Sequence, residues 1–121
     1  MARSIGNAGV ALLTATLLMA ATNPAVSRAA AFRSCKPVVN PYAGSRYEGI
    51  NLRRIQSMRV SCRTARRVTR QAHRKALRLT PTPSGVRTFR WRRWTVTGDI
   101  RGSTDRYVAR ALGGKRVRWV F

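Results

Sequence analysis

Acid–base catalysis would have to rest on very few side chains in this chain of 121 residues. There are three carboxylates, Glu48, Asp99 and Asp105, and a single histidine, His73. The most sensible pairing is ribonuclease-like, with Glu48 as base, His73 as acid and arginines stabilising the charged phosphorane. Nothing in the sequence brings Glu48 and His73 together. We therefore predict no catalytic site, expect His73 to be solvated, and keep the ribonuclease-like activity as the weakest alternative.

Arginine is the abundant functional group. The chain has 25 Lys and Arg against 3 Asp and Glu, which gives a formal charge of +22. A guanidinium pairs with phosphate or carboxylate through two parallel hydrogen bonds, and a net charge of this size attracts polyanions. A GC-rich genome would explain arginine in place of lysine, but not the near absence of acids. We predict that an anionic polymer binds arginines of the expected helix and strands: Arg63, Arg66, Arg67, Arg70, Arg74, Arg78, Arg90, Arg92, Arg93, Arg116 and Arg118.

Several binding functions compete. The leading hypothesis is a module that binds a cell-envelope glycan, an acidic lipid or a nucleic acid by electrostatics. A protein-binding or inhibitor module is the first alternative. A membrane-active, antimicrobial-like cation is the second, because residues 89–94, Phe-Arg-Trp-Arg-Arg-Trp, resemble peptides rich in Arg and Trp. The sequence has no base-reading motif, indicates no small-molecule substrate and leaves the oligomeric state open.

Residues 1–29 have the organisation of a secretory signal peptide. Arg3 provides the positive start, residues 8–22 form an uncharged apolar run, and small residues suited to cleavage follow. The run is shorter than the ~20 residues that a membrane-spanning helix needs. We expect cleavage, a mature charge of +20 once Arg3 and Arg28 are lost, and a secreted location, either extracellular or at the cell wall.

Cysteine chemistry is limited to one pair, Cys35 and Cys62. An exported chain meets an oxidising environment, so two cysteines favour one disulfide bond. Closing this loop would stabilise the fold by roughly 3–4 kcal/mol, which is large for a small domain. A reactive thiol pair or a metal site is disfavoured, because there is no Cys-x-x-Cys motif and His73 is the only histidine. We expect neither a metal nor a cofactor.

The clearest structural element is a helix over residues 61–79. Ser61 suits the N-cap position, and arginines fill one side of the helix. Pro81 disfavours helix at the residue before it. Apolar residues recur on the other side at spacings of three and four: Cys62, Ala65, Val68, Ala72, Ala76 and Leu79.

Residues 86–121 show the alternation of antiparallel strands. We predict strands over 86–97, 106–111 and 115–121, with a two-residue Gly113-Gly114 turn before the last. Within the first of these strands, strict alternation would place Trp91 and Trp94 on opposite faces of the sheet. Either a bulge near residues 92–93 brings both to one face, or both faces of the strand are partly covered.

The remaining chain completes an α+β fold. Residues 30–49 are rich in Pro, Gly and Asn and are predicted to be extended and irregular, whereas residues 50–60 form a strand or a turn leading into one. We predict one amphipathic helix packed on a small three- or four-stranded antiparallel sheet. Residues 50–121 would be a single domain, tied by one disulfide to Cys35.

The stretch Val-Ser-Cys-Arg-Thr-Ala-Arg-Arg-Val at residues 60–68 resembles the helix start of a family of small secreted actinobacterial proteins. The basic and aromatic run over residues 114–121 is similar to the C-terminal hairpin of that family. The resemblance covers residues 32–121. It implies the fold and the secreted location but no activity.

Members of that family typically carry a second cysteine pair in the hairpin, and this chain has none. The resemblance places that pair at Trp91 and Ala111. It implies that the Trp91 ring packs over the neighbouring strand near Ala109 or Ala111 and is more buried than Trp94.

The leader and the cysteine pair give the first testable prediction. We expect the secreted protein to begin between residues 28 and 32 and to weigh two hydrogens less than the reduced chain. Intact-mass analysis, with and without alkylation, measures both quantities. Retention of residue 1, or two alkylatable thiols, would contradict the prediction.

Overall fold

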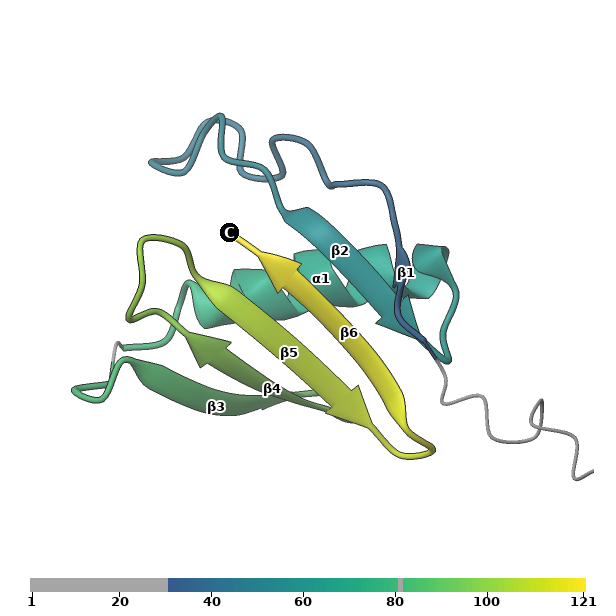
Figure 1. Cartoon of the computed structure of the whole chain (residues 1–121). Coiled ribbons are helices and arrows are strands. Elements are labelled where there is room, and N and C mark those ends of the chain that lie inside the picture. The colour runs from purple at the N-terminus through teal and green to yellow at the C-terminus, as the bar shows by residue number, and fades with distance from the viewer. Residues whose placement is uncertain (1–30, 81) are drawn as a thin grey trace, which may run out of the picture.

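The computed structural model describes residues 31–80 and 82–121. In these residues one helix packs on a six-stranded antiparallel sheet, which confirms the α+β class and the single helix (Figure 1). The predicted signal peptide lies outside the described residues. The elements are β1 (Arg33–Ser34), β2 (Arg53–Met58), α1 (Cys62–Ala76), β3 (Val86–Trp91), β4 (Trp94–Asp99), β5 (Arg106–Ala111) and β6 (Lys115–Val120).

Side chains fix both ends of α1. The Ser61 hydroxyl oxygen accepts a hydrogen bond from the Thr64 amide at 3.1 Å, as expected of an N-cap residue. The helix ends at Ala76, three residues before the predicted end. Arg87 of β3 explains this, because its guanidinium donates to the carbonyl oxygens of Ala76 at 2.7 Å and Leu79 at 3.5 Å. A cation is also favourable beside the negative end of the helix dipole.

The buried face of α1 is one row wider than predicted. The expected residues Ala65, Val68, Ala72 and Ala76 are buried, and the arginines on the opposite side are exposed. His73 lies on the buried face and is 0% exposed, so the prediction of a solvated His73 was wrong. The hydrophobic pattern could not reveal this row, because Thr69 and His73 are polar residues.

The sheet has the order β1-β2-β6-β5-β4-β3, so the prediction of three or four strands was too low. The long strand predicted over residues 86–97 is a hairpin, in which Arg92 and Arg93 form the turn between β3 and β4. Arg92 adopts a φ of 52°, a conformation that usually calls for Gly or Asn, so the sequence carried no turn signal. Trp91 and Trp94 are cross-strand partners in this hairpin, and both face α1 without a bulge.

The N-terminal segment accounts for the remaining strand. β1 pairs with β2, and Val38 forms a bridge with Leu52, so part of the segment predicted to be irregular joins the sheet. In β2 the register shifts near Arg54, whose φ is 50°. This bulge lets Leu52 and Ile55 both face the core, although they differ in parity. The predicted disulfide between Cys35 and Cys62 is confirmed, and it joins the chain after β1 to the first residue of α1.

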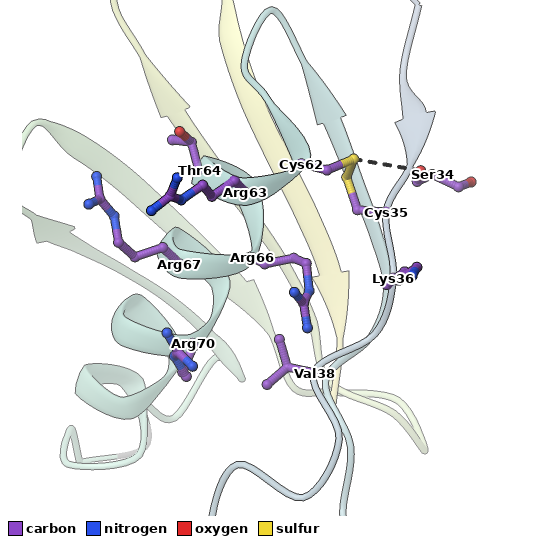
Figure 2. A pocket seen from close by; sticks show the side chains of 10 residues that line it. All are labelled: Ser34, Cys35, Lys36, Val38, Cys62, Arg63, Thr64, Arg66, Arg67 and Arg70. Atoms are coloured by element: carbon purple, nitrogen blue, oxygen red, sulfur yellow. Dashed lines mark hydrogen bonds between the residues drawn. A yellow bond between two sulfur atoms is a disulfide. The ribbon is translucent and has the colours of Figure 1, made fainter.

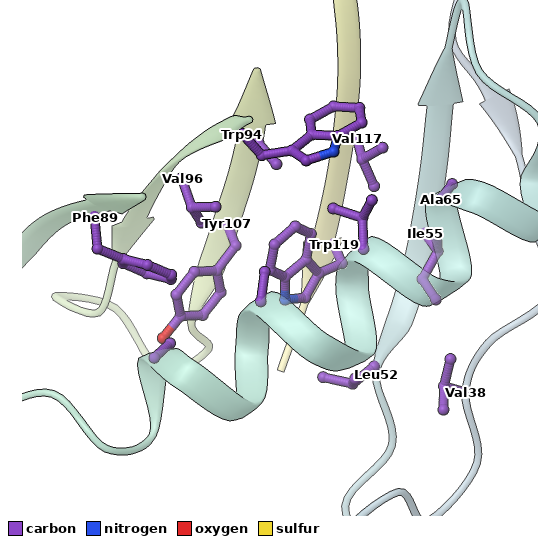
Figure 3. Packing of buried hydrophobic residues seen from close by; sticks show 14 residues of the cluster. Val38, Leu52, Ile55, Ala65, Phe89, Trp94, Val96, Tyr107, Val117 and Trp119 are labelled. Carbon is purple, nitrogen blue, oxygen red and sulfur yellow. The ribbon is translucent and has the colours of Figure 1, made fainter. Parts of the chain in front are cut away.

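The core lies between α1 and the sheet (Figure 3). Tyr107 of β5 and Trp119 of β6 stack with their ring centroids 5.3 Å apart, and both are almost fully buried. Three of the six buried residues of α1 are alanines, so the helix backbone lies close to these rings.

Trp94, not Trp91, belongs to the core. Trp94 is 6% exposed, whereas Trp91 is only partly buried. The expectation that Trp91 packs over the strand holding Ala111 was wrong, because β4 lies between β3 and β5. Ala111 is opposite Lys115 of β6 instead.

The two ends of the sheet carry different connections. One end, which we call the turn end, holds the turns at 92–93 and 112–114 and the connection from β2 to α1. The turn at 112–114 is one residue longer than predicted, and Gly113 and Gly114 have φ values of 81° and 72°. The other end, the loop end, holds residues 41–50 and 100–105.

Arg87 provides a test of how the helix ends. We predict that Arg87→Met destabilises the fold by about 1–3 kcal/mol, because partly buried carbonyl groups lose their donor. Arg87→Lys should recover part of the loss, since both bonds come from one guanidinium nitrogen, Nη1, and a lysine ammonium can also donate more than one bond. Chemical denaturation measures the effect, with Arg90→Met at an exposed position of the same strand as the control. Equal stability of the Arg87→Met and Arg90→Met variants would contradict this role.

Candidate polyanion-binding surface

The first groove lies between the β1 segment and the N-terminal half of α1, and we call it the disulfide groove. It has a volume of about 740 Å³, and the Cys35–Cys62 bond forms part of its lining. Arg66 spans the groove, because its guanidinium donates to the Pro37 carbonyl oxygen at 3.3 Å. Figure 2 shows the cations that line it: Lys36, Arg63, Arg66, Arg67 and Arg70.

The second groove, the tryptophan groove, lies between the start of α1 and the β3–β4 turn. It has a volume of about 710 Å³, and Trp91 and Trp94 form its aromatic lining. The Arg59 guanidinium donates to the Gly113 carbonyl oxygen at 3.2 Å, which holds it against the β5–β6 turn. Five cations line the groove: Arg59, Arg67, Arg92, Arg93 and Lys115.

The third groove, the turn groove, has a volume of about 730 Å³ and lies on the open face of the sheet, away from α1. Arg90, Thr95 and Arg110 form one cross-strand row in it, and all three are exposed, whereas their strand neighbours are buried or partly buried. Arg116 of β6 continues this row directly opposite Arg110. Like charges in directly opposed positions destabilise a sheet. The turn groove is lined by Arg90, Arg93, Thr95, Arg110, Ala111, Leu112 and Lys115.

Shared residues join the three grooves into one surface, which we call the basic track. Thr64 and Arg67 line both the disulfide and the tryptophan groove. Arg93 and Lys115 line both the tryptophan and the turn groove. The track therefore runs from the α1 side, past the turn end, onto the open face of the sheet.

Two arginines of the tryptophan groove adopt a backbone conformation that arginine disfavours. Arg59 and Arg92 have φ values of 59° and 52°, in the left-handed region where glycine is the usual residue. This conformation costs a residue with a side chain roughly 1–2 kcal/mol. Strain of this kind clusters at functional sites.

All three carboxylates lie away from the basic track, at the loop end. Glu48 lies in residues 41–50, Asp99 ends β4 and Asp105 precedes β5. Hydrogen bonds from Arg101 hold the pKa of Asp99 at about 2, and the two residues form an ion pair at 2.9 Å. Among the described residues this is the one ion pair between side chains. No carboxylate therefore neutralises the cations that line the track.

The structure divides the arginines that the sequence analysis singled out. Arg74 lies beyond the track on the C-terminal half of α1, and Arg78 lies beyond it in the turn that follows the helix. Arg116 and Arg118 are on the open face, where Arg118 lies 3.8 Å over the Phe32 ring and donates to Gln56. The track contains Arg63, Arg66, Arg67, Arg70, Arg90, Arg92 and Arg93.

Of the cations that line two grooves, sequence reasoning named Arg67 and Arg93 but missed Lys115. It also missed three cations that line a single groove, Lys36, Arg59 and Arg110. Arg59 and Lys115 come from different elements and meet only at the turn end, while Lys36 and Arg110 extend the track at its two ends. The one available signal was the position of these residues beside predicted turns or strand ends.

The structure does not bring Glu48 and His73 together. Glu48 is exposed in a turn, whereas His73 is enclosed by aromatic rings and shares a 2.7 Å hydrogen bond with the Tyr42 hydroxyl. Burial, with a smaller effect of the nearby Arg87 charge, lowers the pKa of His73 to about 3. His73 is therefore a neutral core residue, and it cannot supply the acid of the ribonuclease-like scheme.

Comparisons with known proteins do not assign this chain to a family. No protein-family model, curated protein or solved structure matches the chain. The resemblance to small secreted actinobacterial proteins stays a prediction. Residues 31–80 and 82–121 contain no group of three or more His, Cys, Asp or Glu that could hold a metal, and no helix in that part of the chain has the length and apolar character to cross a membrane.

The buried His73 predicts a loss of stability in acid. The unfolded chain takes up a proton on His73 near pH 6.5, whereas the folded chain resists it until about pH 3. Unfolding therefore gains a proton between these values, and stability should fall as the pH drops through this window. Thermal melts should show this fall between about pH 7 and 5, before the carboxylates titrate.

The variant His73→Phe separates this effect from general acid sensitivity. Its ring cannot be protonated, so its stability should change little between about pH 7 and 5, even if Tyr42 without a partner lowers it overall. Equal pH slopes for the variant and the native protein would contradict the assignment.

Proposed function

We propose that this protein is a secreted module that binds an anionic polymer through the basic track. The observation that carries the proposal is the continuity of the three grooves. Along one path they gather eleven cations and no carboxylate: Lys36, Arg59, Arg63, Arg66, Arg67, Arg70, Arg90, Arg92, Arg93, Arg110 and Lys115.

Electrostatics favours a bound polyanion at this surface. Cations held this densely repel one another, and a polymer of negative charges would relieve the repulsion and release its own counterions. The opposed pair Arg110 and Arg116 is a direct example of such repulsion. Arginine suits the task, because it pairs with phosphate or carboxylate through two parallel bonds.

Backbone strain supports a selected function for the same surface. Glycine at positions 59 and 92 would relieve the left-handed conformations, yet both positions hold arginine and both line the tryptophan groove. Arginine at these positions therefore costs stability and adds charge to the tryptophan groove, whereas the similar φ of Arg54 belongs to the bulge of β2.

One observation favours an anionic membrane surface as a second candidate. Leu112, at the tip of the β5–β6 turn, is 94% exposed among the cations of the turn groove. A single leucine that enters a lipid layer beside cations would add to electrostatic attachment. Loss of vesicle binding in Leu112→Ser, with unchanged binding to a soluble polymer, would favour this candidate.

The salt dependence of binding tests the proposal. With linear inorganic polyphosphate as the probe, affinity should fall steeply as salt rises from about 50 to 200 mM. The triple variant Arg63→Ala, Arg67→Ala, Arg93→Ala should reduce the slope of log K against log salt by about 2 to 3, because each lost contact removes about 0.7–0.9.

A charge-matched variant is the control. Arg46→Ala, Arg74→Ala, Arg78→Ala removes the same net charge from exposed positions outside the track and should change the slope little. Equal losses in the two triple variants, or binding that does not depend on salt, would overturn the proposal. Arg92→Gly should raise the melting temperature while it weakens binding, which separates the role of that side chain from any role in folding.

A further inference from the structure

The basic track passes from one face of the sheet to the other, and this limits the shape of a polymer that can fill it. The disulfide and tryptophan grooves lie beside α1, whereas the turn groove lies on the opposite face of the sheet. A single ligand in all three grooves has to bend around the turn end. A domain of this size has a radius of gyration of only about 13 Å, whereas duplex DNA stays nearly straight over about 50 nm. The track therefore suits a flexible single chain and not a duplex.

The middle of the track adds an aromatic surface to the charge. Trp91 ends β3, which is the edge strand of the sheet, so no further strand covers it. It is partly buried, lines the tryptophan groove, and has the Arg92 guanidinium over its ring, 5.1 Å from the ring centroid, so a stacked base would either replace this guanidinium or lie against it. A ring beside guanidinium groups suits a polymer that alternates flat rings with negative charges, because bases stack on aromatic side chains while the backbone follows the cations.

We propose that the ligand of the basic track is a single-stranded nucleic acid, with a base stacked at Trp91 and phosphates along the arginines. This inference rests on the proposed polyanion binding and narrows it to one class of polymer. Polyphosphate has the flexibility and the charge but no ring. Duplex nucleic acid has the rings, but they are stacked inside a stiff helix.

The test compares three probes at about physiological salt: an oligodeoxyadenylate of about 12 nucleotides, its duplex with the complementary strand, and linear polyphosphate of similar charge. We expect the single strand to bind more tightly than either of the others. Trp91→Leu should weaken binding of the single strand by about 5- to 150-fold and leave polyphosphate binding within about twofold.

Two further variants keep the result interpretable. Trp91→Phe retains a ring and should retain most of the binding, which distinguishes stacking from damage to the fold. Tyr47→Leu removes a second aromatic ring that has an arginine over it, Arg46 at 4.9 Å, but at the loop end, and it should leave all three affinities unchanged.

The outcomes separate the two proposals. If polyphosphate binds through the track but Trp91→Leu leaves the oligonucleotide affinity unchanged, the nucleic-acid inference fails and the proposed function stands. Duplex binding as tight as single-strand binding, or equal weakening of polyphosphate and oligonucleotide by Trp91→Leu, also overturns the inference. If none of the three probes binds, both proposals fail.

Discussion

The close packing of an alanine-rich helix face on two stacked rings is the contact on which the rest of the structure depends. Ala65, Ala72 and Ala76 are fully buried, and the stacked rings of Tyr107 and Trp119 lie in the same core. Alanine brings the helix near the sheet, and the large rings fill the space that short side chains leave. The disulfide adds a covalent link at the start of the helix, which matters for a domain with a small core.

This packing also determines on which face of the molecule each cation lies. A chain with a formal charge of +22 can bury apolar residues only if its cations stay at the surface. One helix covers one face of a six-stranded sheet, so the arginines of α1 point to solvent on one side and those of β5 and β6 lie on the open face. The two populations meet only where strands end, and the turn end is the place where they join into the basic track.

Several polar residues outside the basic track make contacts within the fold, among them His73, which the sequence analysis considered as a catalytic acid. His73 is neutral, bonded to Tyr42 and packed against Phe121, with ring centroids 4.2 Å apart. Arg87 is used to close the helix, and Asp99 pairs with its neighbour Arg101. These groups lie at the loop end, whereas the grooves of the basic track are lined by cations and by no carboxylate.

What the sequence determined by itself is local. The N-cap at Ser61 and the apolar spacing from Ala65 to Ala76 depend only on neighbours along the chain, so they could be predicted. The disulfide could be predicted because two cysteines allow a single intramolecular pairing.

The tertiary structure alone decided the Arg92–Arg93 turn, the burial of His73 and the joining of Arg59, Arg67 and Lys115 in one groove. The turn places arginine in a conformation that propensity assigns to glycine, and pairing of β3 with β4 is what imposes it. His73 is a polar residue that periodicity cannot count as apolar, and it is buried because aromatic rings enclose it and the Tyr42 hydroxyl bonds its Nδ1. The groove joins residues far apart in the chain, and only the strand order brings them to the same end of the sheet.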